Sequence, residues 1–135
     1  MFIFFKFSMK PLTTILAILM VSMSLKADRN PPAKIAPIEC ESLTISAKFE
    51  KDEHGYSVYV LAKKVKSDKV EWKTKIYQGI FDQSLETDVQ EIYLESLSIS
   101  KSKTQLIATD EAGQKYSLNC KTGSLLEPKA PKIYK

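Results

Sequence analysis

The residues able to do acid–base chemistry are few in this chain. His54 is the only histidine, and it lies in a charged turn between Glu53 and Gly55. A general base needs a nucleophile or a substrate proton within hydrogen-bond reach. No serine hydrolase, zinc protease or phosphate-loop motif accompanies this histidine. We therefore predict no catalytic residues.

Carboxylates cluster in two places, the turn at 50–53 and the segment at 82–91. Calcium takes about six to eight oxygen ligands, which a sharply folded loop supplies. The second cluster has no glycine to permit such a turn, so we interpret it as a solvated acidic loop and predict no metal site. The sequence also contains no glycine-rich nucleotide loop, and we predict no cofactor.

Cys40 and Cys120 are the only cysteines. In an oxidising compartment they allow one pairing, which would close a loop of about 80 residues and add about 4 to 5 kcal/mol of stability. The alternative is two separate buried thiols. We predict the disulfide because the chain begins with an export signal.

The export signal is predicted at residues 1–27. Lys6 and Lys10 precede an apolar, uncharged run at 11–25, and Ala27 offers a small residue at the cleavage point. The run is shorter than the roughly 20 residues that a membrane-spanning helix needs. Cleavage is therefore favoured over an uncleaved membrane anchor, and either Met1 or Met9 fits as the initiator.

Export changes the charge of the protein. Lys6, Lys10 and Lys26 leave with the signal, so 17 of 20 basic residues remain beside all 16 acidic ones, a net charge of +1 instead of +4. Nucleic-acid binding needs a surplus of positive charge. We therefore expect no nucleic-acid partner.

Prolines and glycines mark the domain boundaries. All six prolines lie outside residues 40–126, whereas all four glycines lie inside that range. We predict a proline-rich leader at 28–39, one β domain at 40–126 and a flexible tail at 127–135.

The domain itself is predicted to be all-β, because apolar residues alternate with polar ones along most of it. Short turns between the segments favour antiparallel neighbours. We expect about six antiparallel strands in meander order, forming a small sandwich or a partly open barrel. Their approximate ranges are 43–49, 56–62, 70–76, 91–99, 106–108 and 116–120.

The segment at 88–97 fits two interpretations. Val89, Ile92 and Tyr93 follow a helical spacing, and Thr87 begins a capping box. The alternating ending at 97–100 favours a strand, which we prefer.

Three residues are candidates for surface contact. Tyr77 alternates in phase with Lys73 and Lys75, so we predict that all three lie on the polar face of the third strand. Trp72 lies in the opposite phase with the apolar residues, and we predict that it packs in the core.

Residues 106–123 read LIATDEAGQKYSLNCKTG. This stretch resembles one hairpin of a quinoprotein-type β-propeller blade, with its acidic-glycine turn, Tyr-x-Leu strand and Lys-Thr-Gly turn. The resemblance implies hairpin geometry and no quinone site, because Cys120 stands where such repeats often have Asp and no Trp follows Gly123.

The functional expectation follows from these features. We expect an exported periplasmic or secreted module that binds or supports another component of the cell envelope without catalysis. The alternative is a small secreted hydrolase or inhibitor whose site is assembled only by folding, for instance by joining His54 to the carboxylates at 82–91. A membrane association is expected only if the signal stays uncleaved.

Overall fold

The computed structural model describes residue 32 and residues 34–135. The predicted signal at 1–27 lies outside these described residues, as do residues 28–31 and 33 of the predicted leader. No helix in the described part is long and apolar enough to span a membrane.

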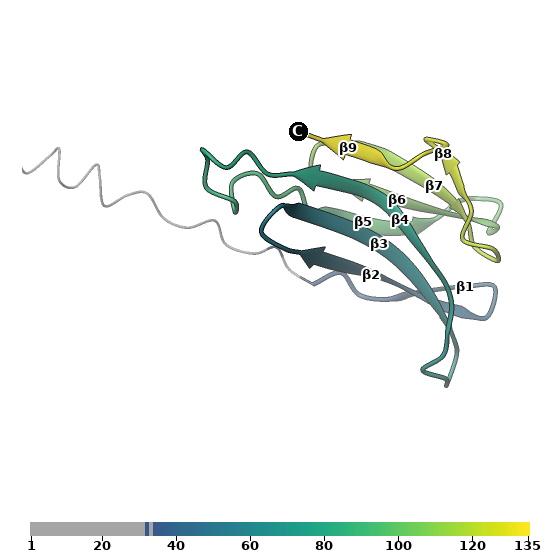
Figure 1. The fold of residues 1–135 in the computed structure, drawn as a ribbon. Helices are drawn as coiled ribbons and strands as arrows, with labels where there is room; N and C mark the ends of the chain where they lie inside the picture. The colour runs from purple at the N-terminus through teal and green to yellow at the C-terminus, as the bar shows by residue number, and fades with distance from the viewer. Residues whose placement is uncertain (1–31, 33) are drawn as a thin grey trace, which may run out of the picture. The chain divides into compact units, whose positions relative to one another are not determined.

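The described chain folds into two β-sheets (Figure 1). The first has the order β1-β2-β3-β4-β9, with β1 Ile38–Cys40, β2 Leu43–Lys51, β3 Gly55–Lys64, β4 Val70–Ile80 and β9 Lys132–Tyr134. The second has the order β5-β6-β7-β8, with β5 Leu94–Ile99, β6 Gln105–Asp110, β7 Lys115–Asn119 and β8 Leu125–Glu127. The predicted all-β class is confirmed, and the two sheets do not close into a barrel, which is consistent with the small sandwich of the two expected forms.

The six expected strands correspond to β2–β7, and neighbouring strands in each sheet follow one another along the chain. The exception is β9, which pairs in parallel with β4. The strand interpretation of 88–97 is confirmed for its second half, since β5 begins at Leu94 and no helix forms there. The hairpin expected at 106–123 forms β6 and β7.

One hydrophobic core joins both sheets. Ile45 and Val60 of the first sheet are fully buried, as are Leu106 and Leu118 of the second. Fully burying such an aliphatic side chain contributes about 1.5 to 3 kcal/mol. The apolar residues whose alternation predicted the strands are therefore the residues that form the core.

The prediction that Tyr77 lies on the surface is wrong. Val58 pairs with Tyr77 but the next residue, Tyr59, pairs with Lys75, so Ile76 is an extra residue on β4. Such a β-bulge shifts the alternation of the strand by one. Ile76 and Tyr77 are consequently both fully buried, and Tyr77 stacks on Tyr116 inside the core.

The expected leader and tail also contribute strands. β1 occupies the end of the segment at 28–39, and β9 lies within the segment at 127–135. The tail was expected to be flexible because it has two prolines and few apolar residues. In the structure, the Tyr134 ring packs edge-on against the Tyr77 ring, with 5.7 Å between the two ring centres. That aromatic contact holds β9 on the sheet.

Candidate binding site

The disulfide between Cys40 and Cys120 fastens the two sheets together and confirms the predicted pairing. Cys40 ends β1 in the first sheet, whereas Cys120 directly follows β7 in the second. Trp72 covers this junction and donates a hydrogen bond of 3.0 Å from Nε1 to the carbonyl oxygen of Cys120. Trp72 packs against the core as predicted, although part of its ring stays accessible.

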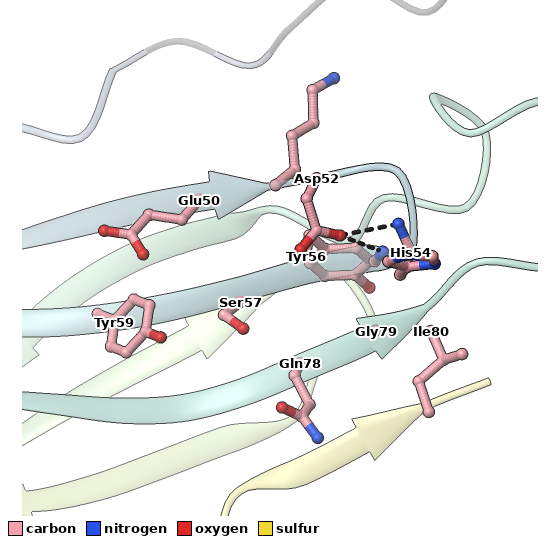
Figure 2. Close-up of a pocket in the computed structure, with 11 residues that line it drawn as sticks. Glu50, Asp52, His54, Tyr56, Ser57, Tyr59, Gln78, Gly79 and Ile80 are labelled. Atoms are coloured by element: carbon pink, nitrogen blue, oxygen red, sulfur yellow. Dashed lines mark hydrogen bonds between the residues drawn. The ribbon is translucent and has the colours of Figure 1, made fainter.

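A shallow cavity of about 430 Å³ lies on the solvent side of the first sheet (Figure 2). Cross-strand pairing explains its composition: Glu50 of β2 pairs with Ser57 of β3, which pairs with Gln78 of β4. Tyr59 lies two residues further along β3 and flanks the cavity. Three strands therefore place polar side chains and one aromatic ring on one face.

Lysines and one carboxylate set the charge of this face. Glu50 Oε1 accepts hydrogen bonds of 3.1 Å from both Lys48 Nζ and Lys73 Nζ. These two hydrogen bonds lower the pKa of Glu50 below its usual value, and the one from Lys48 has the larger effect. Lys73 Nζ also lies 4.2 Å from the centre of the Tyr59 ring, and Lys75 Nζ lies 5.8 Å from it.

Lys73 and Lys75 therefore lie on the outer face as predicted, but the aromatic residue beside them is Tyr59 and not Tyr77. The sequence carried a signal for this residue, because Tyr59 and Leu61 make the second face of β3 partly apolar. Only the pairing of Tyr59 with Lys75 places it next to the lysines.

Asp52, His54 and Ser57 all line this cavity. Asp, His and Ser are the residue types of a serine hydrolase triad. Their contacts differ from that arrangement, however. Asp52 Oδ1 accepts backbone N–H groups of His54 at 2.8 Å and Gly55 at 3.1 Å, which lower the pKa of Asp52. The His54 side chain is 81% exposed and its Nε2 lies 3.2 Å from Glu53 Oε1, and Figure 2 draws no hydrogen bond between Ser57 and His54.

The acidic loop at 82–91 lies next to the His54 turn, since the Phe81 N–H donates to the His54 carbonyl at 2.9 Å. Their side chains line different hollows, however: His54 lines one and Asp82 the next, and the two hollows share Tyr56, Gly79 and Ile80 as walls. Hydrogen bonds from the hydroxyl and backbone of Ser84 lower the pKa of Asp82. Among the described residues, no group of three His, Cys, Asp or Glu side chains is arranged to hold a metal ion.

Two acids of the described chain are buried: Glu91, which belongs to the carboxylate cluster at 82–91, and Asp110, which was not considered as a site residue. Glu91 is 1% exposed and accepts a hydrogen bond of 2.8 Å from Lys51 as well as one from the Tyr93 hydroxyl. Asp110 is fully buried and accepts hydroxyl hydrogen bonds from Tyr116 and Tyr134. The sequence marked Asp110 only as the first residue of a turn, because its tyrosine partners become neighbours only in the folded chain.

Comparison with known proteins gives no match: no family model, no curated protein and no solved structure is significantly similar to this chain.

Proposed function

We propose that this protein is an exported, non-enzymatic binding module, and that it contacts a polar component of the cell envelope through the outer face of its five-stranded sheet. We define this outer face by Glu50, Ser57, Tyr59, Lys75 and Gln78, which line the cavity or lie directly beside it. The observation that carries the proposal is the assembly of these groups from three strands onto one accessible surface.

The chemistry of the outer face favours binding over catalysis. Tyr59 offers an amphipathic ring, which is a common contact in binding surfaces. Lys75 donates a hydrogen bond of 3.1 Å to Gln78 Oε1, so the two side chains are held together beside the ring. His54 pairs with Glu53 in the same exposed turn and not with Ser57, so the pairing of base and nucleophile that nucleophilic catalysis requires is not formed between them.

Export is supported by two independent features. The charge and apolar pattern of the first 27 residues fits a secretory signal. The pairing of Cys40 with Cys120 suits an oxidising compartment such as the periplasm or the external medium. N-terminal sequencing of the exported protein tests cleavage of the signal: a start near Asp28 supports it, and a start at Met1 or Met9 supports the uncleaved membrane anchor instead.

Binding is tested by comparing three forms of the mature protein on envelope extracts. The face variant combines Tyr59→Ser with Lys75→Glu, and the control variant carries Lys115→Glu and Lys121→Glu on the second sheet, where both lysines are exposed. We expect the wild type and the control to retain the same component, and the face variant to retain about tenfold less, a loss of about 1.4 kcal/mol.

Thermal melting of each form shows that all are folded before they are compared. Equal retention by the face variant would reject the outer face as the contact surface. If no component is retained and none raises the melting temperature of the wild type, the binding function itself is rejected.

A further inference from the structure

A second hollow, of about 530 Å³, opens at the edge of the sandwich beside β2. Its walls are inward-facing side chains of the first sheet, Ala47, Phe49 and Val58, together with Tyr93 and Leu94 at the start of β5. Ala47 and Phe49 are partly exposed in this hollow, whereas Val58 and Leu94 are buried.

The local sequence explains why the edge is open. β1 pairs with β2 only over Leu43–Ile45, and Pro37 directly precedes β1. Proline has no N–H to donate to a sheet, so the pairing does not continue past Ile38. The rest of β2 has a strand neighbour only in β3, and the proline-containing segment at 34–37 lines the hollow instead of sealing it.

The rim of the hollow is positively charged. Lys34 and Lys48 are the charged residues in its lining, and no acidic residue lines it. Both lysines are exposed. Lys48 pairs with Glu50 at 3.1 Å, but that carboxylate is shared with Lys73 at the same distance. An apolar interior with a basic rim is complementary to a molecule that has one apolar chain and one anionic end.

We propose that this hollow binds a free long-chain carboxylate, with the chain against Pro37, Ala47 and Phe49 and the carboxylate beside Lys34 and Lys48. The volume lies in the range of ordinary ligand sites, roughly 300 to 1,000 Å³. Withdrawing an apolar chain from water drives the binding, at about 0.8 kcal/mol per buried methylene. Charge attraction at the rim orients the chain with its carboxylate outward.

A single chain suits the hollow better than an added peptide strand does. The segment at 34–37 already lies beside Ala47 and Phe49, so a strand added to β2 would first have to displace it. A single chain that occupies the hollow itself needs no such displacement.

The test measures binding of monomeric hexadecanoate to the full mature protein by titration calorimetry. Ala47→Phe should abolish binding by filling the hollow. Lys34→Glu changes an exposed side chain. It should weaken binding about three- to tenfold and leave melting unchanged. Lys63→Glu, outside the lining, serves as the matched control and should bind like the wild type.

Several outcomes would overturn the proposal. These are no binding of hexadecanoate, equal binding by the Ala47→Phe and wild-type proteins, equal binding of hexadecanoate and its uncharged alcohol, and binding seen only with anionic lipid vesicles or with an extended peptide. The outer-face variant of Tyr59 and Lys75 should bind hexadecanoate normally. Failure of this inference is thus separable from failure of the proposed function.

Discussion

The Tyr134 hydroxyl donates a hydrogen bond of 2.6 Å to the buried Oδ2 of Asp110, 24 residues earlier in the chain. The same oxygen accepts the Tyr116 hydroxyl at 2.8 Å, and the other carboxylate oxygen accepts the Gln114 N–H at 3.0 Å. This contact joins β9 of the first sheet to β6 of the second. It therefore attaches the last strand of the protein to the opposite layer.

Removing this hydroxyl should destabilise the fold. We expect Tyr134→Phe to lower the free energy of unfolding by about 1 to 3 kcal/mol, because a hydrogen bond to a buried carboxylate is lost. Ile133→Ala, in the same short strand but half exposed, should change it by less than about 0.5 kcal/mol. Urea denaturation measures both, and equal effects of the two variants would show that Asp110 does not hold β9.

The buried tyrosines should make the protein sensitive to alkali. Burial, reinforced by the hydrogen bond to Asp110, raises the pKa of Tyr134 to about 12, and burial also raises the pKa values of Tyr77 and Tyr116 above their usual range. In the unfolded chain these hydroxyls ionise near pH 10. The unfolded state therefore loses protons first, and stability that is fully present below about pH 10 is lost as the pH rises toward 12 and beyond.

Urea midpoints at increasing pH, followed together with tyrosinate absorbance, check this dependence. The midpoint should fall above about pH 10, and the Tyr134→Phe variant should show a shallower fall. Ionisation of every tyrosine near pH 10 in a protein that stays folded would contradict it.

Two glycines with positive φ provide a matched pair for testing the packing of Trp72. Gly123 has φ +74°, and an added Cβ would overlap the Trp72 ring, whereas Gly113 has φ +87° and open space around it. We expect Gly113→Ala to cost about 1 to 2 kcal/mol from backbone strain alone. Gly123→Ala should cost a further 1 to 3 kcal/mol or so from overpacking.

The fluorescence of Trp72, the only tryptophan, reports this difference directly. Gly123→Ala should shift its emission, because the ring must move away from the Cys120 carbonyl that it contacts. The Gly113→Ala protein should emit like the wild type. If the two variants have equal free energies of unfolding, the Trp72 ring moves without a loss of stability and the overpacking prediction is wrong.

The disulfide should account for a large share of the stability. The link between Cys40 and Cys120 spans a sequence separation of 80 residues, so replacing both cysteines by alanine should cost about 4 to 5 kcal/mol. Urea denaturation of this double variant measures the loss. The wild type in excess reductant should match the variant, and an unchanged midpoint in reductant would contradict the prediction.

The sequence by itself determined the fold class, six of the strands and the disulfide. Alternation along β2, β3 and β6 reflects local backbone geometry, in which successive side chains point to opposite faces. Two cysteines permit a single pairing, so no knowledge of the fold was needed to name it. Strand alternation is a local property of the chain, and the cysteine pairing follows from a count of residues. Both can be read from the sequence without the fold.

Tertiary structure decided the features that bear on function. The bulge at Ile76 depends on how β4 pairs with β3, and it moved Tyr77 from the predicted surface into the core. The partners of Asp110 and the lysines around Tyr59 come from strands far apart in sequence. Contacts of this kind depend on register and layer packing, which alternation alone does not specify.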